Sequence, residues 1–108
     1  MSNYLIIASE DPYENRRAER MRDLATSLAR RGGKVSVYLA QNAVFGARRA
    51  SRGRHCSTLL TESVDVLADE FSLRERGIDT RALLPGVKVA SPDVVIARLA
   101  QGWKSFWS

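Results

Sequence analysis

Two adjacent carboxylates, Asp69 and Glu70, follow a short stretch that has the pattern of a buried strand. Apolar residues occupy alternate positions of this stretch, at Val64, Val66 and Ala68. In parallel α/β sheets, ligands bind where strands end and helices begin. Two interpretations follow. Either the carboxylates form a site for a cation or a basic partner, or Asp69 caps the next helix and Glu70 favours its positive end.

A short helix is predicted directly after the two carboxylates. Ser72 and Glu75 are three residues apart, which is the spacing of a capping box, and Gly77 is typical of a helix end. The sequence therefore predicts that a strand passes into a helix at Asp69.

Cys56 is the only cysteine of the chain and His55 is the only histidine. An intramolecular disulfide and a zinc site built by this chain alone are therefore excluded. Cys56 has two interpretations. Nearby arginines and a helix start would favour a reactive thiolate, whereas its helical spacing with Leu59 and Leu60 predicts a buried apolar residue. The spacing favours burial.

Four arginines lie in the segment 41–55, which is predicted to be a loop or a broken helix: Arg48, Arg49, Arg52 and Arg54. They form either a docking patch for an acidic protein or an anion, or a solvated loop. Nucleic acid is the weaker alternative, because aromatic residues are not interleaved with them and no helix-turn-helix pattern is present.

Strand-like and helix-like segments alternate along the chain. The first helix has the clearest signals, with Asp11 as cap, Pro12 at the first position and Glu14 at the capping-box position. Its apolar face comprises Met21, Leu24, Ala25, Leu28 and Ala29. A last helix, capped by Ser91 and started by Pro92, carries an apolar stripe of Val95, Ile96, Leu99, Ala100 and Trp103.

The alternation predicts one α/β domain over residues 1–108, a three-layer α/β/α sandwich with a mainly parallel sheet of about five strands. The strands are predicted at 3–9, 34–40, 64–69 and 86–91, with a weaker fifth after Gly102. Ser9, Gln41, Asn42 and Asp69 each follow a strand, so we expect them near the carboxyl-terminal edge of the sheet, where they would form a binding site with Glu70.

These features together resemble the DsrE/DsrF-like sulfur-relay family. The resemblance rests on the element order and on three short segments: KVSVYLAQNAV at 34–44, the Arg-Gly-aliphatic signature at 76–78 and GVKVAS at 86–91. It implies that the end of the third strand carries a cysteine that holds a persulfide, at or beside Asp69. This chain has Ala-Asp-Glu there and no thiol.

The resemblance implies a role in sulfur trafficking, either through Cys56 as the carrier or as a subunit beside cysteine-bearing partners. The alternative is a non-catalytic module for assembly or for binding a small ligand or anion. The phosphate-binding, dinucleotide-binding and nucleophile-elbow motifs are absent, so no cofactor, no metal and no hydrolase chemistry is predicted.

Composition and charge bear on partners and location. The net charge is +5, from 17 Lys and Arg against 12 Asp and Glu. No apolar run approaches the roughly 18 residues of a membrane span, and the first residues lack a signal-peptide pattern, so we expect a cytoplasmic protein. Trp103, Phe106 and Trp107 form either part of the core or an oligomer contact, and the preference of interfaces for Trp and Phe favours the contact. The resemblance implies a homomeric trimer or hexamer, or a hetero-oligomer with related subunits, and a sulfur-carrier protein as a further partner.

Overall fold

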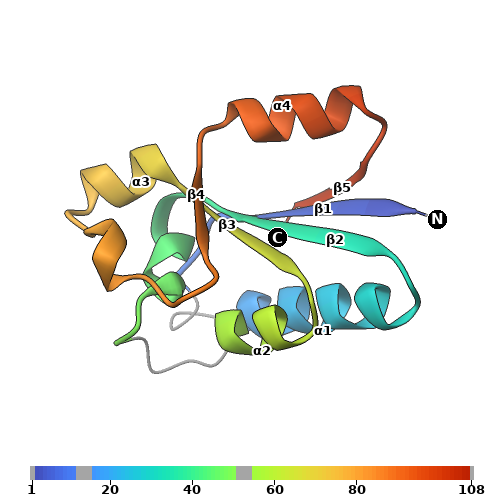
Figure 1. The fold of residues 1–108 in the computed structure, drawn as a ribbon, viewed down its shortest axis with the longest axis horizontal. Coiled ribbons are helices and arrows are strands. Elements are labelled where there is room, and N and C mark those ends of the chain that lie inside the picture. Colours follow the sequence, from blue (N-terminus) through green and yellow to red (C-terminus); the bar gives the residue numbers. More distant parts are fainter. Residues whose placement is uncertain (1, 12–15, 51–54, 108) are drawn as a thin grey trace.

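The computed structural model describes residues 2–11, 16–50 and 55–107. Within these residues, a parallel sheet of five strands has the order β4-β3-β2-β1-β5, with helices on both sides (Figure 1). The elements are β1 (Asn3–Ala8), α1 (Arg17–Arg30), β2 (Lys34–Leu39), the 3₁₀ helix η1 (Gln41–Ala47), α2 (His55–Thr61), β3 (Asp65–Asp69), α3 (Glu70–Glu75), the 3₁₀ turn η2 (Thr80–Ala82), β4 (Lys88–Ala90), α4 (Asp93–Ala100) and β5 (Lys104–Trp107).

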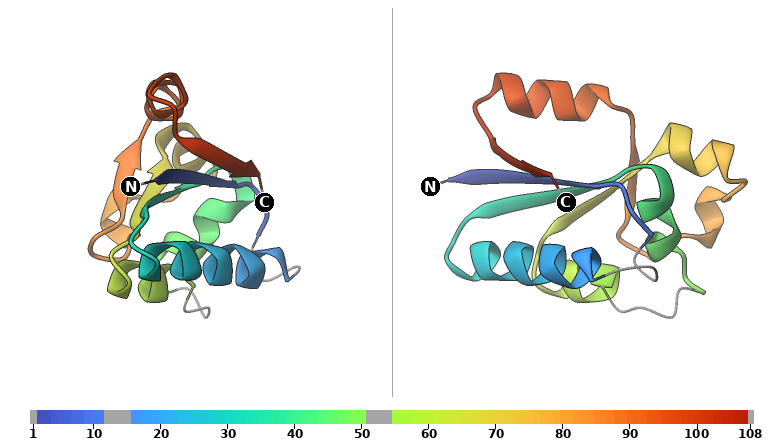
Figure 2. Two further views of the ribbon diagram at one scale, coloured as in Figure 1. Left: turned by 90° about the vertical axis from the view of Figure 1, so that its right-hand side faces the viewer. Right: turned by 180° about the vertical axis from the view of Figure 1, so that it is seen from behind.

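The helices form two layers of unequal size around the sheet, as Figures 1 and 2 show. The pair α1 and α2 covers one face, and the larger apolar cluster lies beneath them, with Val37, Val66 and Leu59 fully buried. On the other face, α4 covers a smaller cluster that includes Tyr38 and Trp103. The predicted three-layer fold with a parallel sheet is therefore confirmed. No helix in the described part of the chain is both long and apolar enough to cross a membrane.

The helix α1 is assigned from Arg17, and the side chain of Arg16, which precedes it, makes no capping hydrogen bond. The predicted first turn at Pro12 and Glu14 lies outside the described residues. The apolar face is largely as expected, with Met21 and Ala25 buried. Leu24 is the exception, because 37% of its surface stays exposed.

The last helix corrects a second prediction. No residue of α4 is fully buried, and the exposed fractions of Ile96 and Leu99 are 64% and 45%. Val94 and Val95 instead face the sheet and pack against the smaller cluster. The predicted stripe is therefore wrong in part, because Val95 contacts the sheet together with Val94, whereas Ile96, Leu99 and Ala100 are exposed. Trp103, beyond the helix, is buried against the sheet.

Candidate functional site

The carboxyl-terminal edge of the sheet gathers the polar residues that follow the strands. Because the strands are parallel and in register, Ala8, Leu39 and Ala68 lie side by side near their ends. Ser9, Gln41, Asn42 and Asp69 follow these positions, so the structure places them at the same edge, as the strand pattern predicts.

Asp69 is the centre of a buried polar network at this edge. The side chain of Asp69 shares a face of β3 with Leu67, on the α4 side of the sheet. One carboxylate oxygen accepts a hydrogen bond of 2.5 Å from the Tyr38 hydroxyl. The other accepts bonds from the backbone N–H and the hydroxyl of Ser72, at 2.9 and 2.6 Å. We call Tyr38, Asp69 and Ser72 the Asp69 network.

The electrostatics of the Asp69 network fix its protonation state. Burial by itself would raise the pKa of Asp69, but the hydrogen bonds from Ser72 and Tyr38 outweigh it and lower that pKa. Burial, together with the bond to Asp69, raises the pKa of the Tyr38 hydroxyl above its ordinary value. Near neutral pH the carboxylate therefore stays ionised and the phenol stays protonated, so neither group is poised to exchange a proton.

The capping interpretation of Asp69 is confirmed, since its side chain accepts from the N–H of Ser72 at the start of α3. The predicted capping box of Ser72 with Glu75 is wrong, because the helix begins three residues earlier and Ser72 lies in its first turn. Glu70 also lies in the first turn, where its carboxylate is 3.7 Å from Arg74.

The Asp69 network also holds the segment that follows β2. The backbone N–H of Gln41, a residue with a φ of +50°, donates to the Ser72 hydroxyl at 2.7 Å. Arg76 donates through Nε to the Asn42 side chain at 3.0 Å and through Nη1 to the Ser72 carbonyl at 3.3 Å. The arginine of the Arg-Gly-aliphatic signature therefore ties α3 to the start of η1.

Sequence reasoning missed Tyr38 as a member of this site. The signal that could have found it is its place on β2, since Tyr38 and Asp69 each lie near the end of a predicted strand, and the structure pairs these two strands. A buried tyrosine hydroxyl needs a hydrogen-bond partner, and the carboxylate at the next strand end is the group within reach.

Cys56 lies on the opposite side of the sheet from the Asp69 network. It belongs to the cluster under α1 and α2, and only 3% of its surface is exposed. Burial raises the pKa of the Cys56 thiol to about 12. The structure therefore does not bring Cys56 together with Asp69. The burial of Cys56 that its helical spacing predicts is confirmed.

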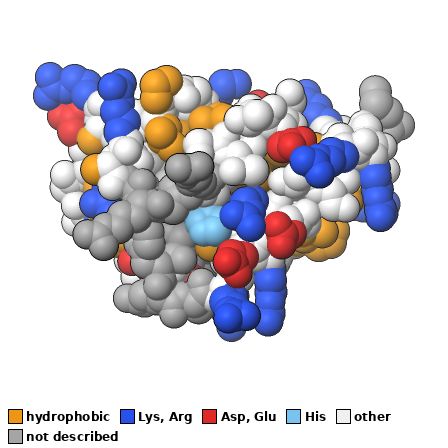
Figure 3. Space-filling model, turned by 90° about the horizontal axis from the view of Figure 1, so that it is seen from below, with side chains coloured by type: hydrophobic (Ala, Val, Ile, Leu, Met, Phe, Trp, Pro, Cys, Tyr) orange, Lys and Arg blue, Asp and Glu red, His pale blue; other side chains and the backbone are white. Residues whose placement is uncertain are grey.

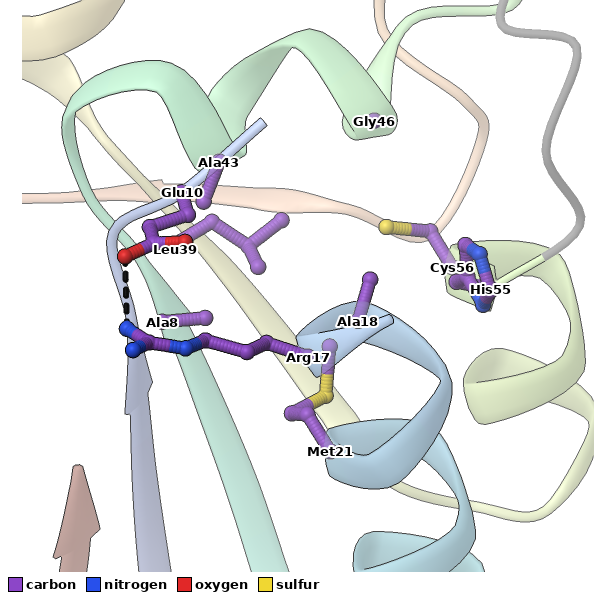
Figure 4. A pocket seen from close by; sticks show the side chains of 10 residues that line it. All are labelled: Ala8, Glu10, Arg17, Ala18, Met21, Leu39, Ala43, Gly46, His55 and Cys56. Atoms are coloured by element: carbon purple, nitrogen blue, oxygen red, sulfur yellow. Dashed lines mark hydrogen bonds and ion pairs between the residues drawn. The ribbon is translucent and has the colours of Figure 1, made fainter. Parts of the chain in front are cut away.

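A small cavity adjoins the Cys56 sulfur (Figure 4). Its volume is about 20 Å³, which is room for roughly one water molecule. The walls include Met21, Leu39 and Ala43, while Glu10 and Arg17 form an ion pair of 2.6 Å beside it. His55 also borders the cavity, and burial followed by the nearby Arg22 lowers the pKa of its imidazole, so the ring is neutral at neutral pH.

The described arginines of the segment 41–55 have structural contacts. Arg48 donates through Nε to the Phe45 carbonyl at 3.0 Å and lies over the Phe45 ring. Arg49 donates through Nε to the Leu83 carbonyl at 3.0 Å. Both therefore attach the end of η1 to neighbouring backbone. Arg52 and Arg54 lie outside the described residues, and a docking role for the four arginines stays a prediction.

Solved structures share this fold over the whole chain. The YchN protein of E. coli matches with a TM-score of 0.87 and 21% identity, covering 100% of both chains. MTH1491 from Methanobacterium thermoautotrophicum matches with a TM-score of 0.82 and 24% identity, again over 100% of both chains. BT1422 from Bacteroides thetaiotaomicron matches with a TM-score of 0.77 and 14% identity, over 99% of this chain and 95% of its own.

Comparison of the sequence with family models assigns the protein to a family, which the shared fold alone does not do. A comparison with curated protein sequences found no match. The DsrE/DsrF-like family matches residues 2–107, which include the Asp69 network, the Arg-Gly-aliphatic signature and all five described strands. This protein therefore belongs to the DsrE/DsrF-like family.

Proposed function

We propose that this protein is a subunit of a sulfur-relay assembly in which a cysteine of another subunit, and not Cys56, carries the sulfur. The observation that supports this most directly is the Asp69 network. At the strand end where the family resemblance implies a persulfide-bearing cysteine, this chain has a carboxylate that accepts three hydrogen bonds. Asp69 caps a helix and orders the adjoining loop, but its carboxylate cannot carry a persulfide.

The environment of Cys56 supports the same conclusion. The attacking species in sulfur transfer is the thiolate. A pKa of about 12 leaves roughly one thiol in 10⁵ ionised at pH 7. A donor would also have to reach a sulfur that is 3% exposed and faces a water-sized cavity. Cys56 is therefore a poor carrier.

The α4 helix supports a role in assembly. Ile96 and Leu99 lie on one side of the helix and are both largely exposed. Charges of both signs, on Asp93 and Arg98, lie on the same helix. An apolar pair on a helix that carries both signs of charge suits contact with another copy or with a related subunit, because such a surface does not oppose a single sign of charge to itself. Homomeric trimers or hexamers and mixed assemblies with cysteine-bearing relatives are both compatible with this surface.

Mass spectrometry after incubation with a persulfide donor tests the proposal. The proteins compared are wild type, Cys56→Ser and Glu70→Cys. Glu70 is chosen because it adjoins the expected carrier position, and its side chain is half-exposed and outside the Asp69 network. We expect a gain of about 32 Da, one sulfur atom, on Glu70→Cys only, removed by reductant. The same reversible gain on wild type and its absence from Cys56→Ser would show that Cys56 is the carrier and would end the proposal.

A further inference from the structure

A groove of about 420 Å³ lies between α1 and the β5 edge of the sheet. Figure 2 shows β5 at the outer edge, next to β1. We call this hollow the β5 groove, and its lining residues are Ile6, Arg17, Arg20, Met21, Leu24, Phe106 and Trp107. Phe106 is paired in register with Ile6, whose side chain belongs to the cluster on the α1 side.

The β5 groove leaves apolar surface uncovered. Leu24 and Phe106 are each 37% exposed and Trp107 is 77% exposed. All four residues of β5 are exposed, and within the described chain no strand pairs with its outer edge. An apolar edge strand with unpaired backbone N–H and C=O groups readily pairs with another chain. The groove and the strand edge together therefore have the properties of a docking surface.

The charges around the β5 groove select the kind of partner. Arg17 is paired with Glu10 at 2.6 Å, whereas the Arg20 guanidinium makes no ion pair within the described part of the chain. The acidic residues Glu19 and Asp23 of α1 lie near His55 instead. Figure 3 shows acidic and basic side chains mingled around that histidine. The side of α1 at the groove is thus basic, and the side at α2 is mixed.

A second copy of this chain is a poor occupant of the β5 groove. A two-fold contact places the same patch of both copies together, and the described lining of this patch has two arginines and no acidic residue, so a second copy would offer Arg20 no carboxylate. Like charges opposed across an interface are unfavourable. The chain as a whole also carries a net charge of +5. An acidic partner would avoid this repulsion, and its carboxylates could pair with Arg20.

We propose that the β5 groove docks an acidic, extended segment of a partner protein. The segment pairs with the free edge of β5 as an added strand, and main-chain hydrogen bonds supply part of the affinity. One apolar side chain of the segment lies between Leu24 and Phe106, and a carboxylate pairs with Arg20. Neither the Asp69 network nor Cys56 lines this groove, so the proposal goes beyond the sulfur-relay role and does not depend on it.

Tryptophan fluorescence provides the readout, because Trp107 is exposed while Trp103 is buried. The probes are a synthetic peptide of alternating Glu and Leu, and its counterpart with Lys in place of Glu. We expect the acidic peptide to shift the Trp107 emission to the blue and to bind roughly tenfold or more tightly than the basic one, with binding that weakens as salt is added.

Two charge-reversal variants of α1 test the contact. Arg20→Glu should abolish the preference for the acidic peptide. Arg31→Glu changes the net charge equally but lies at the other end of α1, outside the groove, so it should keep that preference. The proposal is overturned if neither peptide binds, if both bind equally, or if Arg20→Glu still prefers the acidic one. It is also overturned if light scattering shows an oligomer whose Trp107 emission is already blue-shifted without peptide, since a second copy would then fill the groove.

Discussion

Replacing Asp69 with alanine tests whether the Asp69 network stabilises the fold as its geometry indicates. The substitution removes the acceptor of three hydrogen bonds from a residue that is 6% exposed. Two consequences are separable. The first turn of α3 loses its cap, and the Tyr38 hydroxyl, which is buried, loses its acceptor. The Ser72 hydroxyl is less affected, because it still accepts from the Gln41 N–H.

The expected loss follows from these two effects. Removing an aspartate cap costs about 1 kcal/mol, and leaving a buried hydroxyl without a partner costs about 1–3 kcal/mol. We therefore expect Asp69→Ala to lower the free energy of unfolding by about 2–4 kcal/mol. For a domain of this size, that corresponds to a fall in Tm of roughly 10–20 °C.

Urea unfolding followed by circular dichroism measures the loss, with Asp65→Ala as the matched control. Asp65 is in the same strand, but its pair with Lys88 is long, at 3.8 Å, and exposed, so its removal should cost at most about 1 kcal/mol. Tyr38→Phe should be milder than Asp69→Ala, and the double variant should lose less than the two single losses combined, because no hydroxyl is then left unpaired. A loss from Asp69→Ala no larger than that of the control, or strictly additive losses, would refute the reasoning.

Four further predictions concern separate features. Because the pKa of Asp69 is lowered in the fold, its contribution to stability is present above the unfolded pKa of about 3.9 and is lost as the pH falls through the folded value; Asp69→Ala should therefore flatten the acid side of the stability profile. Cys56 should react with a thiol reagent far more slowly in the native protein at pH 8 than in urea, and equal rates would contradict its burial. Gly33→Ala should cost about 1–3 kcal/mol in urea unfolding, because the added Cβ would lie 2.8 Å from the Tyr4 ring; an unchanged midpoint would show that the ring moves freely. Ile96→Glu should reduce the mass measured by light scattering if α4 forms the assembly contact, and an unchanged oligomer would place that contact elsewhere.

The sequence predicts the sheet well because its strands are short apolar runs separated by helix signals. β2 and β3 begin and end within a residue of their predicted bounds, and the fifth strand is confirmed after Gly102. The capping role of Asp69 was one of two open interpretations, and the structure decides it. The capping box predicted from the spacing of Ser72 and Glu75 is wrong, because the same spacing also occurs inside a helix that begins earlier, at Glu70.

Tertiary contacts account for the features that local patterns could not give. The orientation of α4 depends on which side of a nearly all-apolar helix meets the sheet, and Val94 and Val95 meet it while Ile96 and Leu99 do not. The bond between Tyr38 and Asp69 joins residues 31 positions apart, so it exists only once β2 and β3 are paired. The β5 groove likewise appears only when a strand from the end of the chain lies beside β1.

The donors around Asp69 explain how one fold position can serve two chemistries. The Ser72 N–H and hydroxyl and the Tyr38 hydroxyl converge on a single anion. Donors arranged in this way stabilise a negative charge on sulfur as well as on oxygen, and they would lower the pKa of a thiol placed among them. A cysteine at this position would therefore be activated by the surroundings that here lower the pKa of a carboxylate. The carboxylate keeps the helix cap and the ordered loop but removes the nucleophile, so the fold is retained, and in the relay proposed above the sulfur is carried by a thiol of another subunit. Glu70→Cys leaves Asp69 and its donors in place, so any sulfur that it accepts would reflect the half-exposed position of its thiol beside this site and not activation by these donors.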